Sequence, residues 1–243
     1  MSFFRKKKRQ IILLVILFIL LIAVNYAFLD TELERFLDTS ENTNVARVID
    51  GDTIVSDENI HIRLLGINTP EKGEKYYEEA KDFLNNSIFN TTIKLEFTND
   101  RTDKYGRTLA YIFLGDENVN IKLVENGFAN YYFYSGMDKY SDDLKKAWNE
   151  CMRNNKNLCE KSDDACRTCI TIGTSKDFIT DNCSFSCDIS GWEIKGEGRD
   201  KWIFNDTIKP DETKGFELNL ANSSGSLFLR DRQGKLVEWE GGS

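Results

Sequence analysis

A long apolar run near the N-terminus constrains this chain more than any other feature of its sequence. Residues 11–24 are all apolar, and the run continues to residue 29 with Asn25 as its one strongly polar break. In a helix, about nineteen residues span roughly 28 Å, close to the roughly 30 Å hydrocarbon core of a bilayer. We therefore interpret 11–29 as a transmembrane anchor, with a cleaved signal peptide or a buried core helix as the alternatives.

The charges on either side of this run set its orientation. Residues 5–9 read RKKKR, and the first acidic residue is Asp30. Under the positive-inside rule, residues 1–10 form a basic cytoplasmic tail and residues 30–243 lie outside the cytoplasm. A signal peptide would export the same residues, and the protein would then be secreted.

The exported part is acidic, which excludes one class of nucleic-acid binder. The whole chain has a net charge of −8, and without the five basic residues of the tail 27 basic residues face 40 acidic ones. Proteins that coat DNA are strongly basic. A nucleic acid bound here would have to be held by a few local charges and a metal ion.

The cysteines are even in number and clustered. All six fall within 37 residues, at Cys151, Cys159, Cys166, Cys169, Cys183 and Cys187. In an oxidising compartment such a set indicates disulfides, although the spacing from Cys166 onward also fits a four-cysteine zinc site. Export favours disulfides, and the sequence does not choose among the fifteen pairings that six cysteines allow.

The chain has a single histidine, His61. A metal centre with several histidines is therefore excluded within one chain, and a Ser-His-Asp triad would have to use this residue. His61 shares an expected strand with Ile60 and Ile62, and we interpret it as structural.

Shifts in composition divide the exported part into segments. These are an acidic tether (30–41), a domain of strands and helices (42–157), a cysteine-rich joint (158–169) and a module of short strands and turns (170–243). Within the domain we expect strands in 44–56, 60–66, 92–97 and 107–114, and helices in 74–89, 119–127 and 138–156. The pattern predicts an α+β domain followed by an all-β module.

Three motifs in the α+β domain carry candidate chemistry. They are VIDGDT (48–53) with Asp52, RLLGINTPE (63–71) with Arg63, Asn68, Thr69 and Glu71, and RTDKYGR (101–107) with Lys104, Tyr105 and Arg107. Together they offer oxygen ligands for a hard cation, two guanidinium groups for phosphate and a carboxylate that can take a proton from water. This combination is typical of metal-assisted phosphodiester hydrolysis.

In order and spacing these motifs, with TDKYGRTLAYIF and NIKLVENGFA, resemble the staphylococcal nuclease (thermonuclease) family over residues 44–157. The resemblance implies an OB-fold barrel of five strands with three helices, and calcium-dependent hydrolysis of DNA and RNA to 3′-phosphate products. It also implies roles for the motif residues. Asp52, Asn68 and the Thr69 carbonyl would bind calcium, Glu71 would be the general base, Arg63 and Arg107 would bind phosphate, and Lys104 and Tyr105 would lie beside the nucleotide.

One position departs from the family, which has an aspartate where this chain has Asn68. An amide oxygen coordinates calcium but brings no charge, so we expect weaker calcium binding without loss of activity. An aspartate has nearly the same shape, and we expect it to fit at this position with little change in packing.

The C-terminal module has a second resemblance. Segments 187–212 and 225–240, with DISGWEIK, WIF, TIKPDE and LFLRDRQGKLVE, resemble a lamin-tail domain, an immunoglobulin-like β-sandwich. This resemblance implies a binding or targeting module of unknown ligand, and a generic stabilising β-domain is the alternative. For the whole chain we expect a monomeric, membrane-anchored nuclease that faces outward. The alternative function is a non-catalytic OB-fold module that binds nucleic acid or a protein partner.

Overall fold

The computed structural model describes residues 12–18, 40–98, 100–134, 136–173, 175–219 and 225–241. Residues 12–18 form a helix, while the rest of the predicted anchor, the basic tail and tether residues 30–39 lie outside the described residues. None of the helices described is long and apolar enough to cross a membrane. The chain divides into two compact units, Met1–Glu41 and Asn42–Ser243, and the second spans the residues of the predicted α+β domain, joint and β-module.

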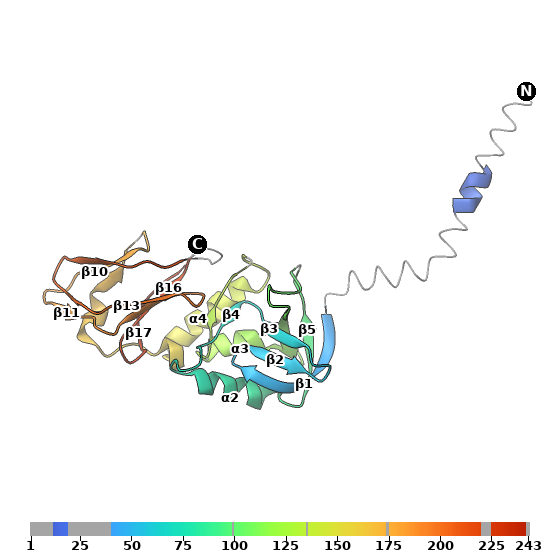
Figure 1. The fold of residues 1–243 in the computed structure, drawn as a ribbon, viewed down its shortest axis with the longest axis horizontal. Coiled ribbons are helices and arrows are strands. Elements are labelled where there is room, and N and C mark those ends of the chain that lie inside the picture. Colours follow the sequence, from blue (N-terminus) through green and yellow to red (C-terminus); the bar gives the residue numbers. More distant parts are fainter. Residues whose placement is uncertain are drawn as a thin grey trace, which may run out of the picture. The chain divides into compact units, whose positions relative to one another are not determined.

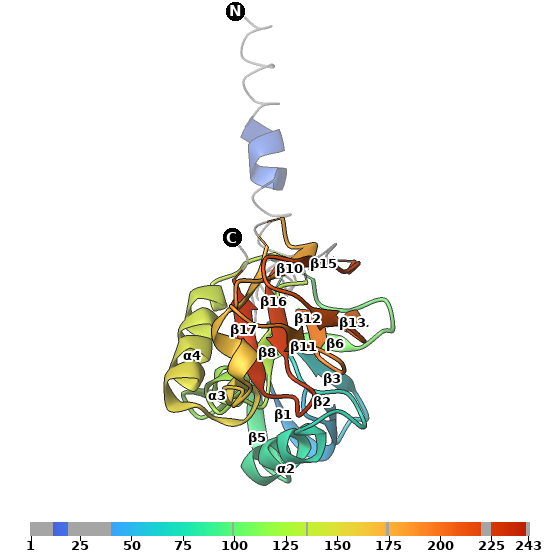
Figure 2. The ribbon, with the colours of Figure 1, turned by 90° about the vertical axis from the view of Figure 1, so that its left-hand side faces the viewer.

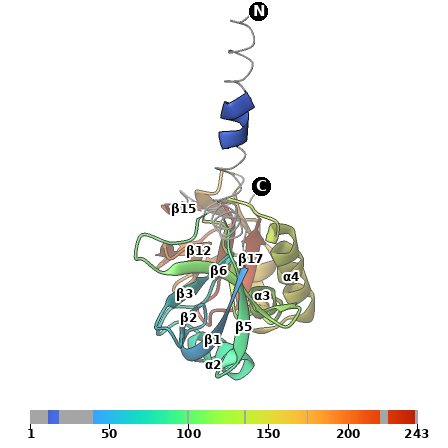
Figure 3. The same ribbon diagram turned by 90° about the vertical axis from the view of Figure 1, so that its right-hand side faces the viewer.

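The expected barrel is present in the second unit. Its strands are β1 (Ser40–Asp50), β2 (Thr53–Ser56), β3 (His61–Leu64), β5 (Thr92–Glu96), β6 (Thr108–Leu114) and the short β7 (Glu117–Asn118). They lie in the order β3-β2-β1-β5-β6-β7, and a parallel pairing of β3 with β6 closes β1, β2, β3, β5 and β6 into a five-stranded barrel. Figure 3 shows these strands, and the arrangement fits the predicted OB-fold.

Three helices accompany the barrel, close to the predicted ranges. They are α2 (Tyr77–Ile88), α3 (Val119–Glu125) and α4 (Ser141–Asn154), and Figure 1 labels each of them. The apolar spacing in the sequence forms the buried faces, with Leu84 of α2 and Leu144 and Trp148 of α4 fully buried. Gly127 follows α3 with φ +69°, and a Cβ there would lie 2.3 Å from the Lys156 carbonyl oxygen, so a larger residue would not fit.

The C-terminal module contains strands and turns, as expected. Its strands are β9 (Ile170–Ile172), β10 (Phe178–Asp181), β11 (Cys187–Asp188), β12 (Glu193–Gly196), β13 (Lys201–Ile203), β14 (Thr207–Ile208), β15 (Thr213–Gly215), β16 (Leu227–Arg230) and β17 (Leu236–Glu240). They form the sheets β13-β12-β16-β17 and β15-β10-β9 and the pair β11-β14. Figure 2 shows β17, β16, β12 and β13 side by side. The all-β architecture agrees with the expectation, and the lamin-tail identity stays a prediction.

The module packs on the barrel through buried side chains. Phe228 of β16 and Leu236 of β17 belong to the same hydrophobic core as the barrel residues. The Phe228 ring lies 5.1 Å from that of Trp148 in α4. Arg230 is buried and donates a hydrogen bond to the Leu158 carbonyl oxygen. The burial of Phe228 and Leu236 removes apolar surface of both the module and the barrel from water, which stabilises the module in this position.

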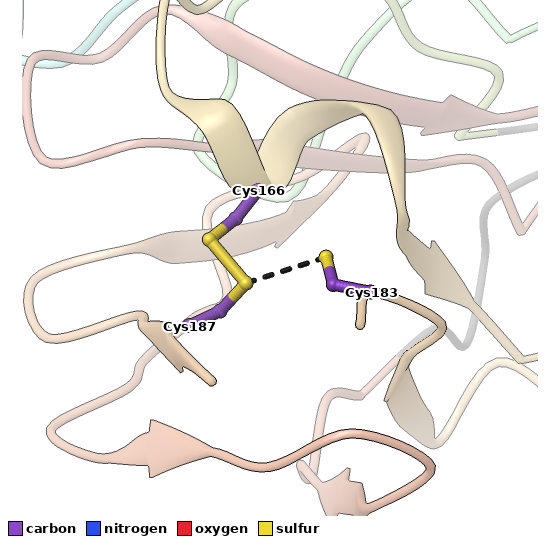
Figure 4. A group of neighbouring side chains, drawn as sticks. All are labelled: Cys166, Cys183 and Cys187. Carbon is purple, nitrogen blue, oxygen red and sulfur yellow. Dashed lines mark hydrogen bonds between the residues drawn. A yellow bond between two sulfur atoms is a disulfide. The ribbon is translucent and has the colours of Figure 1, made fainter. Parts of the chain in front are cut away.

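All six cysteines form disulfides, so the disulfide interpretation is confirmed over the zinc alternative. The pairs are Cys151–Cys159, Cys166–Cys187 and Cys169–Cys183. The first ties the end of α4 to the 3₁₀ turn η1 (Asn157–Cys159). The other two link the joint to the module, from Cys166 in the 3₁₀ turn η2 (Ala165–Thr168) and from Cys169 directly after it. These two disulfides are adjacent, since the Sγ atoms of Cys183 and Cys187 lie 3.4 Å apart. Figure 4 shows the Cys166–Cys187 disulfide with the Cys183 side chain next to it.

Candidate active site

Asp52 lies in the turn between β1 and β2, and its carboxylate is buried. Its Oδ2 accepts hydrogen bonds from the Thr69 amide and the Thr69 hydroxyl, both at 3.1 Å, and its Oδ1 accepts one from the Thr53 hydroxyl at 3.1 Å. A Cβ at Gly51 would lie 2.9 Å from both Thr69 and Ala80, so this turn approaches the loop and α2 only with glycine there. The structure therefore places Asp52 against the amide and hydroxyl of Thr69, while the predicted role of the Thr69 carbonyl stays a prediction.

Arg63 on β3 joins these residues into one network. Its Nη2 lies 3.0 Å from Asp52 Oδ2, and the same atom donates to the Ile67 carbonyl oxygen at 2.9 Å and to Asn68 Oδ1 at 3.4 Å. Its Nη1 donates to the Leu64 carbonyl oxygen at 2.5 Å. The side chain is only 12% exposed. Arg63 thus fixes the loop that carries Asn68 as well as presenting a guanidinium group at the site.

Asn68 ends the short strand β4 (Ile67–Asn68), which pairs with β8 (Asn130–Tyr131). Its side chain is buried, and its Nδ2 donates a hydrogen bond to the Gly198 carbonyl oxygen at 3.3 Å. A carboxylate has no proton to donate at neutral pH. An aspartate here would keep the shape of the side chain but would lose this hydrogen bond, since it would place two acceptors against each other. Its effect on packing stays a prediction.

Glu71 follows this loop and is more exposed. Its side chain is 41% exposed, and its Oε1 lies 2.6 Å from Nε of Arg199, a residue of the C-terminal module. Its backbone amide donates to Glu74 Oε2 at 2.9 Å. The carboxylate is therefore accessible to water, as a general base must be, and it is already paired with a cation.

Arg107 is held by Asp103 across the tight turn before β6. Nε and Nη2 of Arg107 each lie 2.7 Å from Asp103 Oδ2. Burial alone would raise the pKa of Asp103, but hydrogen bonds from Arg107 and from the Tyr105 amide outweigh it and lower that pKa. The Arg107 guanidinium lies 5.6 Å from the Tyr105 ring and Lys104 Nζ lies 5.1 Å from it, which places the three side chains together.

A cavity of about 510 Å³ lies between the loop that carries Asn68 and the turn that carries Arg107. Of the predicted residues, it is lined by Arg63, Asn68, Lys104, Tyr105 and Arg107. Asp52 and Thr69 do not line the cavity. Asp52 contacts Arg63, which does, and Thr69 is the residue after Asn68. Glu71 is outside the lining as well, but its partner Arg199 is part of it.

The oxygen atoms of this region fit a hard cation. Asp50 is the last residue of β1, and its Oδ1 accepts a hydrogen bond from the Asp52 amide at 3.2 Å. Sequence reasoning missed this residue, although VIDGDT contains it. Burial and the neighbouring charge of Asp52 raise the pKa of Asp50. The Asp52 carboxylate and the Asn68 amide oxygen both contact Nη2 of Arg63, and Thr69 follows Asn68 in the chain. Carboxylate, amide and carbonyl oxygens are the ligands that calcium takes, so these residue types fit the ion.

The structure adds two residues of the C-terminal module that sequence reasoning missed. Gly198 and Arg199 lie in the turn between β12 and β13 and line the same cavity as Arg63 and Arg107. A Cβ at Gly198 would lie 3.6 Å from the Tyr132 hydroxyl oxygen, in ordinary contact. No motif links this turn to the barrel, so only the packing of the module could have revealed it.

Comparisons with known proteins agree with this geometry. A family model described as staphylococcal nuclease homologue matches residues 61–161. This range includes the motifs RLLGINTPE (63–71) and RTDKYGR (101–107) but not Asp52. The thermonuclease of Staphylococcus intermedius is 38% identical over 130 residues, covering 50% of this chain and 77% of that protein. The thermonuclease of Staphylococcus hyicus is 37% identical over 123 residues, covering 47% of this chain and 73% of that protein.

A third relative shows how far the similarity extends among other proteins. The SPbeta prophage-derived endonuclease YokF of Bacillus subtilis is 36% identical over 111 residues, covering 41% of this chain and 38% of that protein. The family model and the relatives named as thermonucleases support a nuclease. The barrel, the motif residues gathered around it and these similarities together lead to one conclusion: the chain belongs to the staphylococcal nuclease family.

Proposed function

We propose that this protein is a calcium-dependent nuclease that hydrolyses phosphodiester bonds of DNA and RNA and leaves 3′-phosphate products. The proposal rests on the contacts of Arg63 with Asp52 and Asn68 at the cavity that Arg107 also lines. Two guanidinium groups and a set of oxygen ligands at one cavity suit a phosphodiester held beside a hard cation.

Each side chain then has a separate role. Arg63 and Arg107 bind phosphate oxygens and stabilise the charge that grows on them in the transition state. Glu71 takes a proton from the attacking water, whose oxygen bonds to phosphorus while the bond from phosphorus to the 5′-oxygen breaks. The 5′-oxygen takes a proton from solvent, and the phosphate remains on the 3′-oxygen. Lys104 and Tyr105 lie beside the bound nucleotide.

Calcium, when held by Asp52, Asn68 and the Thr69 carbonyl, supplies positive charge that neutralises the phosphate. Asp52 and Thr69 are fixed to each other by two hydrogen bonds, and Asn68 is fixed by Arg63. These contacts hold the oxygen ligands in place before the substrate arrives, which lowers the cost of ordering them.

The test is nuclease activity of the full chain in detergent on single-stranded DNA, duplex DNA and RNA. We expect degradation with calcium, none with a chelator, products that carry a 3′-phosphate, and a strong loss of activity in Glu71→Gln. Binding of the same nucleic acids without any cleavage in calcium would contradict the proposal and would favour the non-catalytic binding module.

We also propose that residues 11–29 anchor a monomer in the membrane with residues 30–243 outside the cytoplasm. The apolar run, its basic flank and the three disulfides support this location. Protease added to intact cells should then remove the exported part, and alkylation of the six cysteines should require reduction. Protection from the protease together with six reactive thiols would show that the protein faces the cytoplasm.

A further inference from the structure

The turn between β12 and β13 reaches from the C-terminal module into the candidate active site. The Gly198 carbonyl oxygen accepts a hydrogen bond from Asn68 Nδ2 at 3.3 Å, and Arg199 Nε lies 2.6 Å from Glu71 Oε1. Both turn residues line the cavity that Arg63 and Arg107 line from the barrel. One wall of the cavity therefore comes from a part of the chain about 130 residues away from the motifs.

Ion pairs and buried hydrogen bonds hold this turn in place. On one side, Lys195 Nζ lies 2.9 Å from Glu74 Oε2, and Lys201 Nζ lies 3.0 Å from Glu74 Oε1. On the other side, the fully buried Glu197 accepts hydrogen bonds from the Phe133 amide at 3.1 Å and the Ser226 amide at 3.2 Å. Because residues before and after Arg199 are held in this way, the turn has a defined position and Arg199 lines the cavity from it.

Among the three ion pairs just described between this turn and the barrel, that of Arg199 with Glu71 is the most exposed to solvent. The Arg199 side chain is 70% exposed and that of Glu71 41% exposed. Ion pairs exposed to this degree add little to the stability of a protein, because water screens the two charges. A phosphodiester that enters the cavity offers Arg199 two anionic oxygens, to which a guanidinium binds in a planar, bidentate geometry. The phosphate can therefore replace Glu71 as the partner of Arg199.

We propose that Arg199 is a further phosphate-binding residue of this nuclease, supplied by the C-terminal module and added to Arg63 and Arg107. The inference rests on the proposed function and names one more contact of the same site. Transfer of Arg199 from Glu71 to the substrate leaves the Glu71 carboxylate without its cation, free to accept a proton from water. The module then contributes to substrate binding directly through its β12–β13 turn.

The opposite role is a brake, in which Arg199 blocks Glu71 and competes with the substrate. The two roles differ in sign. A phosphate contact predicts weaker substrate binding when Arg199 is removed, whereas a brake predicts tighter binding or faster hydrolysis.

The experiment measures binding of a fluorescently labelled, single-stranded oligonucleotide to the full chain in detergent, with a chelator so that the oligonucleotide stays intact. Dissociation constants are determined over a range of salt concentrations for the wild type, Arg199→Ala, Arg199→Lys and Arg232→Ala. Arg232 is a matched control, because it lies in the same module, is 52% exposed and pairs with Asp188. Thermal unfolding of each variant checks that the fold is intact.

We expect Arg199→Ala to weaken binding about tenfold and to reduce the slope of log K against log salt by about 0.7, the loss of one contact to single-stranded phosphate. Arg199→Lys should keep the slope and recover part of the affinity, since lysine retains the charge but not the fork. Arg232→Ala should match the wild type. With calcium present, the KM of Arg199→Ala should rise by the same factor as its dissociation constant.

An Arg199→Ala variant with the affinity and salt slope of Arg232→Ala would overturn the proposal, and so would tighter binding or faster hydrolysis. A wild type that binds the oligonucleotide but never cleaves it would contradict the nuclease function alone, and Arg199 would still be tested by the binding data. A wild type that neither binds the oligonucleotide with the chelator nor cleaves it with calcium would overturn both proposals. If it cleaves without measurable binding, the KM of Arg199→Ala in calcium decides the role of Arg199.

Discussion

The two walls of the candidate active site are built in different ways. On the barrel wall, Arg63 is buried and bonded to Asp52 and to the loop that carries Asn68. On the wall from the C-terminal module, Arg199 is largely exposed and held by one ion pair with Glu71. The barrel wall is therefore preorganised by buried hydrogen bonds, whereas the module wall can exchange its partner when a substrate arrives.

The two walls should also differ in how much they contribute to the stability of the protein. Removing a buried, multiply bonded cation leaves its partners unsatisfied, which costs several kilocalories per mole in stability. Removing an exposed cation costs little stability, so its effect should be confined to the substrate. Four measurements sharpen this comparison.

The largest effect should come from the barrel arginines. Arg107→Ala should lower kcat/KM about 10²- to 10³-fold, the loss expected when one charge-assisted contact to the transition state is removed. Arg63→Ala should lower activity at least as much and should also lower the melting temperature, because Asp52 loses its partner.

Steady-state kinetics and thermal unfolding of the two variants test this, with Arg232→Ala as the control. If the activity of Arg107→Ala lies within about twofold of that of the wild type, Arg107 does not stabilise the transition state. An Arg63→Ala variant that melts with the wild type would show that its buried bonds contribute no stability.

The next effect concerns the disulfides of the module. Cys166 and Cys187 close a loop with a sequence separation of 21, and loss of such a bridge is expected to destabilise the fold by about 3 kcal/mol through the unfolded state. The variant with both cysteines replaced by alanine should therefore unfold at a lower urea concentration. Replacing Cys151 and Cys159, with a separation of 8, should cost somewhat less, about 2.5 kcal/mol. An unchanged urea midpoint for the first variant would show that this bridge does not stabilise the module.

A smaller effect, dependent on pH, should come from the ion pairs that hold the module turn. Burial alone would raise the pKa of Glu74, but the Glu71 amide, Lys195 and Lys201 lower it to about 2. The folded state therefore binds this proton more weakly than the unfolded state. The resulting stability is fully present above about pH 4.5 and is lost as the pH falls toward about 2.

Glu74→Gln removes this contribution, so it should be less stable than the wild type by about 2 kcal/mol at pH 7. The difference between the two proteins should shrink steadily below pH 4.5. Urea unfolding at several pH values measures it, and a difference that stays constant down to pH 2 would show that the Glu74 ion pairs do not hold the turn.

The sequence predicts the barrel wall well and the module wall hardly at all. Alternating and helical spacing locate the strands and helices of the barrel. Asp52 and Arg63 meet because the β1–β2 turn lies beside β3, and the loop after β3 brings Thr69 to Asp52. Arg199 reaches Glu71 only because Phe228 and Leu236 pack the module onto the barrel core. Such contacts between distant segments leave no periodic pattern in the sequence, and for the same reason the pairing of the six cysteines could not be deduced.

Asn68 is the residue where the two walls meet, and replacing it tests both at once. Its Oδ1 faces Arg63 on the barrel, and its Nδ2 donates to Gly198 on the module. Asn68→Asp adds a carboxylate beside Asp52, and a neighbouring charge is worth on the order of 1–3 kcal/mol. The calcium concentration for half-maximal activity should therefore fall about tenfold, with a smaller change in the saturated rate, while Asp52→Asn should raise it.

The same substitution should weaken the contact between the walls, because the new carboxylate has no proton for the Gly198 carbonyl. Without calcium, Asn68→Asp should then melt slightly below the wild type, by the equivalent of about 1 kcal/mol, the typical worth of one hydrogen bond. Calcium should reverse this loss, since the ion binds the folded protein more tightly when the added charge is present. Calcium titrations of activity and thermal unfolding with and without calcium separate the two effects. An unchanged calcium midpoint would mean that this side chain does not touch the metal. An unchanged melting temperature without calcium would mean that the bond of Asn68 to Gly198 adds no stability to the contact between the two walls, which the apolar packing of Phe228 and Leu236 would then hold without it.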